Sequence, residues 1–191
     1  MRLKFFGLIL LALVICGCGS TTAKNVEVEK PAVDPIEEML KNMTLAEKIG
    51  QMVMIGVHGT AVDADSSFML TQYHIGGVIF FDRNMDSREQ VKKFAADLNR
   101  TAAEKVPLFI ALDEEGGRVS RMKHALTPPP SQAEIGSTGN PNNARTYANL
   151  TGQELKKIGV NVNFAPVADV GDSERCYSAD AEETARFVQE A

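Results

Sequence analysis

Residues 36–191 alternate between two hydrophobic patterns, one typical of strands and the other typical of helices. Four short runs are almost wholly apolar, as expected of strands that are covered on both faces. These runs are residues 52–57, 77–81, 108–113 and 160–167. Amphipathic helical patterns cover residues 68–73, 87–102 and 144–158, and others begin near residues 44 and 180. The repeated strand-then-helix order predicts an α/β fold with a parallel sheet.

Polar residues mark the predicted helix ends. Thr44 followed by Glu47 has the spacing of a capping box, as does Ser87 followed by Gln90. Asp180 and Glu183 open the last helix in the same way, and Gly159 ends the helix before the fourth strand. The last helical pattern reaches Ala191 without a glycine or proline stop, so we expect the sequence to be cut there.

The first 18 residues have the pattern of an export signal. Arg2 and Lys4 precede an uncharged apolar stretch, residues 5–18, that is too short to span a bilayer comfortably. The stretch ends in Ile-Cys-Gly-Cys, which resembles the lipobox of bacterial lipoproteins and implies that Cys18 is lipidated. A plain secretory cut near Gly19, or a buried apolar segment, is the alternative.

Residues 19–35 are rich in Ser, Thr, Lys, Glu and Pro and predict a flexible tether. We therefore expect an exported protein that its lipid anchors in the membrane of the cell envelope, on the periplasmic or surface side. If Cys16 leaves with the signal and Cys18 carries lipid, only Cys176 remains, and no intramolecular disulfide can form.

Charge and histidine content restrict the remaining partners. Lysine and arginine number 20 against 25 acidic residues, a net charge of -5, and there is no basic run, which argues against nucleic acid. His58, His74 and His124 are too scattered for a zinc pattern, so we expect no metal and no cofactor.

The segment from Asp113 to Arg121 begins where the third strand ends, at the edge where loops of parallel α/β folds bind ligands. Side chains alternate along a strand, so Asp113 points with Phe109 and Ala111, away from the set that faces the helices. The following glycine pair allows a tight turn that can return Arg118 and Arg121 toward the acidic residues. A carboxylate beside a planar guanidinium suits sugar hydroxyls, which both donate and accept hydrogen bonds.

This segment, DEEGGRVSR, resembles the Asp-Gln/Glu-Glu-Gly-Gly-Arg-Val-x-Arg signature of glycoside hydrolase family 3, in its β-N-acetylhexosaminidase branch. Residues 43–52, 76–80 and 159–169 resemble further family segments in the same order. The resemblance implies a (β/α)8 TIM-type barrel, which takes ~250 residues. We therefore expect residues 36–191 to be a truncated N-terminal half of such a barrel rather than an open, doubly wound sheet.

The resemblance also implies roles for single residues. Asp113 and Arg121 match the residues that hold the non-reducing N-acetylglucosamine, and Arg175 matches the arginine of the family's Arg-Ser-Phe/Tyr segment. Cys176 replaces the serine there, and the loop before Arg175 is shorter than in the family, so Arg175 can miss the pocket. The family's histidine loop and aspartate nucleophile have no match in the sequence. No catalytic residue is therefore assigned, and the chain alone is not expected to turn over.

Other polar residues have structural interpretations. The side chains of Glu114 and Glu115 diverge, whereas a retaining pair of carboxylates needs ~5 Å separation around the bond. Asn161, Asn163 and Asp169 share a parity on the fourth strand and predict a polar network inside the barrel, although Asp169 can instead cap the next turn.

The leading hypothesis is that the full-length protein is a lipid-anchored, retaining exo-β-N-acetylhexosaminidase. Its expected substrate is the terminal N-acetylglucosamine of cell-wall or chitin-type glycans. The alternative is a non-catalytic, sugar-binding surface lipoprotein.

Overall fold

The computed structural model describes residues 34–102, 106–121 and 127–191. The expected signal peptide, Cys18 and the tether up to residue 33 lie outside the described residues. Four short strands form one parallel sheet in the order β1-β2-β3-β4, which confirms the predicted parallel α/β architecture. The strands are β1 (Met54–Gly56), β2 (Gly77–Ile79), β3 (Phe109–Leu112) and β4 (Val162–Asn163).

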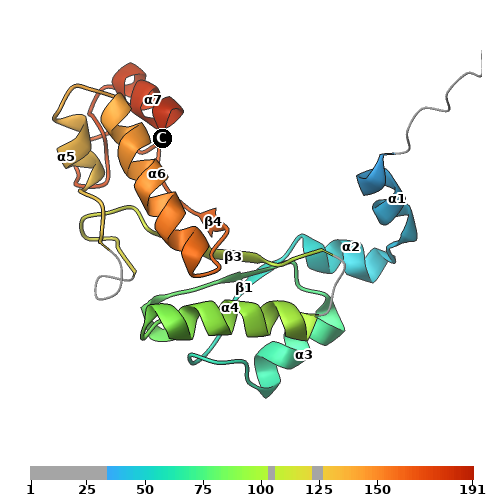
Figure 1. Cartoon of the computed structure of the whole chain (residues 1–191). Helices are drawn as coiled ribbons and strands as arrows, with labels where there is room; N and C mark the ends of the chain where they lie inside the picture. Colours follow the sequence, from blue (N-terminus) through green and yellow to red (C-terminus); the bar gives the residue numbers. More distant parts are fainter. Residues whose placement is uncertain (1–33, 103–105, 122–126) are drawn as a thin grey trace, which may run out of the picture.

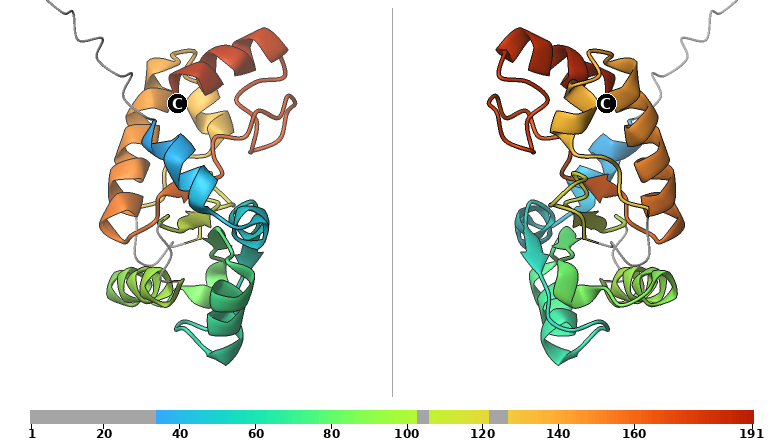
Figure 2. Two further views of the ribbon diagram at one scale, coloured as in Figure 1. Left: turned by 90° about the vertical axis from the view of Figure 1, so that its right-hand side faces the viewer. Right: turned by 90° about the vertical axis from the view of Figure 1, so that its left-hand side faces the viewer.

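Helices precede, connect and follow the strands. They are α1 (Pro35–Asn42), α2 (Leu45–Gln51), α3 (Ala64–Tyr73), α4 (Arg88–Ala102), α5 (Gln132–Gly136), α6 (Asn142–Lys157) and α7 (Ala181–Glu190), with a 3-10 turn η1 (Asp82–Asn84) after β2. Figure 1 shows α3 and α4 together on one side of the strands, whereas α5, α6 and α7 form a second group at the other end. Both side views in Figure 2 separate the same two groups. Among the described helices, none combines the length and the apolar character that crossing a membrane requires.

Helix starts follow the predicted caps. The hydroxyl of Thr44 accepts from the N–H of Glu47, and the Glu47 carboxylate accepts from the N–H of Thr44, so the predicted capping box is confirmed. Asp180 caps α7 by accepting from the N–H of Glu183. A further capping box, Ser131 with Glu134, begins α5, a short helix that the hydrophobic pattern did not predict.

Two apolar clusters hold the elements together. The larger one joins the outward-facing residues of the strands to α3, α4 and the end of α6; its fully buried members include Leu70, Val78, Phe80, Phe94, Leu98, Ile110 and Leu112. The smaller cluster joins α5, α6 and α7 through Ile135, Ala144, Tyr177 and Phe187. The rings of Tyr177 and Phe187 stack with their centroids 5.1 Å apart. The second group of helices therefore has its own packing centre, next to the end of the sheet.

Exposure along β3 agrees with the predicted alternation at Phe109, whereas Ala111, which has the same parity, is fully buried. Leu108, Ile110 and Leu112 are 1% exposed or less, while Phe109, on the other face, is 56% exposed. Phe109 lies level with Gly77 of β2, where a Cβ atom would come 3.1 Å from the Phe109 Cβ. Asp113, the next residue after β3 with the parity of Phe109, therefore points to the inner face of the curved sheet.

The fourth strand is much shorter than the run of apolar residues predicted. Val162 and Asn163 alone form ladder pairs, with Ala111 and Leu112. Before them, the side chain of Asn161 accepts from the N–H of Ile110 at 2.8 Å and donates to the carbonyl of Leu108 at 2.9 Å.

The expected polar network of Asn161, Asn163 and Asp169 is therefore wrong in its geometry. Asn161 and Asn163 share their parity with Ile110 and Leu112, the outward set, and their amides bond to the backbone of the β3 segment. Asp169 is exposed and lies 3.7 Å from a guanidinium nitrogen of Arg175.

Candidate sugar-binding site

Asp113 and Arg121 meet at the carboxyl end of β3. A terminal guanidinium nitrogen of Arg121 donates to a carboxylate oxygen of Asp113 at 2.9 Å. The two side chains are 24% and 23% exposed, so the pair is sheltered but reachable from solvent. The structure thus brings together the two residues that the sequence placed eight positions apart on either side of a glycine turn.

The turn between them depends on its two glycines. Gly116 and Gly117 have φ values of 87° and 54°, in the left-handed region that glycine adopts without strain. A Cβ atom on Gly116 would lie 2.3 Å from the carbonyl oxygen of Pro130, and one on Gly117 would lie 2.2 Å from a carboxylate oxygen of Glu174. Neighbouring segments therefore leave no room for a Cβ atom at either glycine without a local shift.

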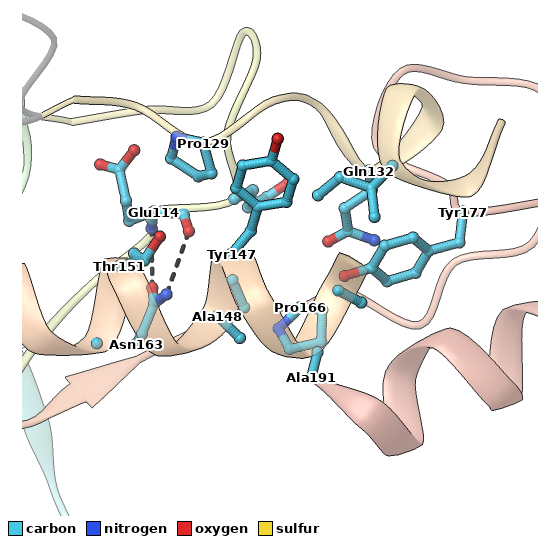
Figure 3. A pocket seen from close by; sticks show the side chains of 15 residues that line it. Glu114, Pro129, Gln132, Tyr147, Ala148, Thr151, Asn163, Pro166, Tyr177 and Ala191 are labelled. Carbon is cyan, nitrogen blue, oxygen red and sulfur yellow. Dashed lines mark hydrogen bonds between the residues drawn. The ribbon is translucent and has the colours of Figure 1, made fainter. Parts of the chain in front are cut away.

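Glu114 ties the start of the turn to its end. Its side chain is buried, and one carboxylate oxygen accepts from the backbone N–H of Arg121 at 2.9 Å. The backbone N–H and carbonyl of Glu114 both bond to the side-chain amide of Asn163, as the dashed lines in Figure 3 show. These contacts agree with the structural role expected of Glu114, while its other carboxylate oxygen is buried without a hydrogen-bond partner among the described residues.

Arg121 keeps free hydrogen-bonding capacity. Its Nε is buried and has no hydrogen-bond partner within the part of the chain that the structure describes. Its other terminal nitrogen lies 3.8 Å from Asp82, a loose contact with a carboxylate that is 72% exposed. The guanidinium also lies 5.8 Å from the ring centroid of Phe81, and that of Arg83 lies 4.7 Å from the same centroid. Among the described residues, the Arg121 guanidinium therefore makes one strong contact, to Asp113.

Arg175 forms a different pair, with Glu115. Its Nε and one terminal nitrogen donate to the two carboxylate oxygens at 2.7 and 2.9 Å, a bidentate arrangement. The Glu115 side chain is 6% exposed and that of Arg175 is 40% exposed. These hydrogen bonds and the Glu115 charge raise the pKa of Arg175 above its usual value. Arg175 is thus held beside the Asp113 segment, but through Glu115 and not through Asp113.

The adjacent Glu174 holds the same turn. One of its carboxylate oxygens accepts from the backbone N–H of Arg118 at 2.7 Å, and its carbonyl accepts from the N–H of Ala133 at 3.1 Å. Sequence reasoning missed two contacts of this loop, from Glu115 to Arg175 and from Arg118 to Glu174. The only available signal was the Glu-Arg dipeptide itself, because the partners lie 56 and 60 residues away.

A cavity of about 150 Å³ lies on the helix side of the same loops, among Glu114, Glu115, α5, α6 and the segment after β4. In Figure 3 the rings of Tyr147 and Tyr177 and the amide of Gln132 enclose it. Burial raises the pKa of Tyr177, and the Gln132 amide bonds the backbone of Val167 in both directions. Asp113 and Arg121 do not line this cavity, so it is separate from their pair.

The model of the glycosyl hydrolase family 3 N-terminal domain matches residues 44–191. This chain belongs to glycoside hydrolase family 3. It is 36% identical over 151 residues to the beta-hexosaminidase of Xanthomonas campestris pv. campestris strain B100, covering 72% of this chain and 44% of that protein. It is 32% identical over 145 residues to the beta-hexosaminidase of Idiomarina loihiensis, covering 71% and 43%.

Solved structures of family 3 enzymes agree in fold. The β-N-acetylglucosaminidase of Paenibacillus sp. str. FPU-7 superposes with a TM-score of 0.74 at 38% identity, covering 78% of this chain and 30% of that one. The NagZ of Neisseria gonorrhoeae in complex with N-trifluoroacetyl-D-glucosamine superposes with a TM-score of 0.67 at 26% identity, covering 72% and 44%. The four parallel strands with their helices correspond to part of the family's TIM barrel, as the resemblance implied. This family 3 chain thus spans less than half the length of these relatives.

Proposed function

We propose that this family 3 chain forms the part of a retaining exo-β-N-acetylhexosaminidase that holds the terminal N-acetylglucosamine. The proposed substrates are cell-wall or chitin-type glycans. The proposed sugar contacts are Asp113, Arg121 and Arg175.

The proposal depends on the guanidinium of Arg121, whose Nε has no hydrogen-bond partner among the described residues. A buried Nε without a partner among the described residues costs free energy unless a ligand or water satisfies it. The Asp113 carboxylate next to it still has acceptor capacity beyond its single bond to Arg121. A sugar with neighbouring hydroxyls supplies both the acceptors that Arg121 lacks and the donors that Asp113 can take.

Arg175 has a more restricted part in the proposal. Two of its nitrogens are engaged by Glu115, and its remaining terminal nitrogen lies 3.7 Å from the exposed Asp169. That outer nitrogen is the one that can donate to a glycan. Glu115 then fixes the direction of the guanidinium, as bidentate pairing does.

The chemistry of cleavage needs groups other than these. A retaining glycosidase uses a carboxylate nucleophile and a second group that serves as acid and base. None of the residues matched to the family motifs has either role, so we propose that this chain on its own binds the sugar and does not hydrolyse the glycoside.

The proposed location follows from the first 35 residues. The charged start, the apolar stretch and the position of Cys18 support lipidation of that cysteine and a tether that leads to the folded part. The full-length enzyme would then act at the membrane surface of the cell envelope. Mass spectrometry of the chain isolated from a bacterial host tests this, because a diacylglyceryl adduct on Cys18 is expected and an unmodified cysteine would contradict it.

Titration of the whole chain with N-acetylglucosamine by calorimetry tests the sugar-holding role. We expect a dissociation constant on the order of 1 mM, equivalent to about -4 kcal/mol. Asp113→Asn removes the charge that holds Arg121 and should weaken binding about tenfold, while Asp65→Asn, at an exposed site on α3, should leave it unchanged. Equal affinities for all three proteins, or no binding by the wild type, would contradict the proposal.

A chromogenic β-N-acetylglucosaminide distinguishes the catalytic part of the proposal. We expect no release of the chromophore by the chain alone, and steady turnover would overturn the assignment. The alternative is a non-catalytic sugar-binding lipoprotein. A stop codon directly after Ala191 in the coding DNA would support it, whereas a continuing frame with a histidine loop would support the enzyme.

A further inference from the structure

The side-chain amide of Asn163 bonds both backbone groups of one residue, Glu114, in the loop that follows β3. Its carbonyl oxygen accepts from the backbone N–H of Glu114 at 2.9 Å, and its amide nitrogen donates to the backbone carbonyl of Glu114 at 3.1 Å. Figure 3 shows both bonds side by side at the edge of the cavity. A side-chain amide that donates and accepts on one residue reproduces the pairing of a neighbouring strand.

This pair of bonds, the Asn163 clamp, lies where the backbone ladder stops. Leu112 and Asn163 are the last paired residues of β3 and β4, and the N–H of Phe164 makes the final backbone bond, to the carbonyl of Leu112 at 2.9 Å. Beyond this point the side chain of Asn163 continues the pairing by two residues along the β3 segment, to Glu114. Asp113 therefore lies between two residues whose backbones are both fixed to β4.

Glu114 carries this restraint to the other half of the sugar-binding pair. Its buried carboxylate accepts from the backbone N–H of Arg121 at 2.9 Å. Its own backbone follows directly on Asp113. A single residue thus touches the backbone of both partners, and Asn163 holds that residue in place.

Asn161 provides an internal comparison. Its side-chain amide also accepts one backbone bond and donates another, from the N–H of Ile110 at 2.8 Å and to the carbonyl of Leu108 at 2.9 Å. The type of contact is similar, but it joins two residues in place of one, and the nearer of them lies three positions before Asp113. Both amides secure the edge of the sheet, and only Asn163 is joined to the site.

We propose that Asn163 is a positioning residue, which sets the distance and direction between Asp113 and Arg121 by clamping Glu114. The inference rests on the proposed sugar-holding role of that pair. It assigns to β4 a share in sugar affinity without any contact between β4 and the sugar.

The test compares Asn163→Ala with Asn161→Ala in the whole chain, because each substitution removes one side-chain amide that accepts one backbone hydrogen bond and donates another to the β3 segment or its continuation. We expect both variants to lower the thermal midpoint to a similar degree. Only Asn163→Ala should weaken binding of N-acetylglucosamine, by about tenfold, measured at a temperature where both variants are folded. Asn161→Ala should stay within about twofold of the wild type.

A spectroscopic signal of Arg121 separates positioning from general loosening. In ¹⁵N-labelled protein without sugar, the side-chain Nε–H resonance of Arg121, assigned from Arg121→Lys, should move in Asn163→Ala and stay in place in Asn161→Ala. Equal sugar affinities for the two variants, or an unmoved Arg121 signal in Asn163→Ala, would overturn the inference. If the wild type binds no sugar, the proposed function fails, while the Arg121 signal still decides whether Asn163 positions the pair.

Discussion

Two carboxylate–guanidinium pairs begin two residues apart in the loop after β3, and they differ in how fully their hydrogen bonds are used. Asp113 and Arg121 share one contact of 2.9 Å, and the Arg121 Nε has no partner among the residues described. Glu115 and Arg175 share two contacts, of 2.7 and 2.9 Å, around a carboxylate that is 6% exposed. The first pair has donors and acceptors left for a ligand, whereas the second has few.

The comparison shows that residue type alone does not separate a pair with open hydrogen-bonding positions from a closed one. Alternation along the strand points Asp113 to the inner face, while Glu115 is buried against the loop that contains Arg175. A closed, bidentate pair fixes two loops to each other. An open pair at the same strand end can exchange a water contact for a sugar hydroxyl.

The largest expected effect is on stability, from Glu115→Ala. Removing one member of a buried pair leaves its partner without hydrogen bonds, although the part of Arg175 that is exposed can be rehydrated. We expect a loss of about 2 kcal/mol in the free energy of unfolding, measured by urea denaturation. Asp113→Ala, the matched truncation in the open pair, should cost less than about 1 kcal/mol. Equal losses would erase the distinction between the pairs.

A smaller effect, on affinity, is expected from Arg121→Lys. Lysine keeps the positive charge but loses the planar fork that the sugar-holding role needs. Affinity for N-acetylglucosamine should fall about tenfold, or about 1.4 kcal/mol. Arg186→Lys, on the exposed face of α7, serves as the control and should change nothing. Full retention of affinity in Arg121→Lys would mean that charge alone is sufficient and that the open fork is not used.

The smallest effect is expected from Glu174→Gln. The Glu174 carboxylate oxygen accepts from the N–H of Arg118, and a glutamine carbonyl can accept the same bond. We expect thermal unfolding and sugar affinity to stay within about 0.5 kcal/mol of the wild type. A loss larger than that of Arg121→Lys would show that the negative charge of Glu174, and not only its geometry, belongs to the site.

Much of the fold could be predicted because its signals are local. The caps at Thr44 and Asp180 and the apolar faces of α4 and α6 depend on residues within one or two turns. The ends of the strands were predicted less well. Met52 is 86% exposed and caps α2 instead of joining β1, and in β4 side-chain amides take over the pairing that backbone was expected to provide.

The same contrast between local and long-range contacts applies to the candidate site. The return of Arg121 toward Asp113 follows from a glycine turn within nine residues, so a motif could predict it. The Glu115–Arg175 pair and the Asn163 clamp join segments that are 60 and 49 residues apart. Such contacts depend on strand register, and strand parity without the register led to the wrong environment for Asn163.

Phe81 connects the Asp113–Arg121 pair to loops much earlier in the chain. Its ring is faced by the guanidinium groups of both Arg121 and Arg83, and the Arg83 Nε donates to the carbonyl of Val57. Asn84, which is fully buried, donates to the same carbonyl and to that of Gly59. The segments that follow β1, β2 and β3 are therefore in contact with one another. The Phe81 ring that faces Arg121 is thus held next to the loop that follows β1, far earlier in the chain.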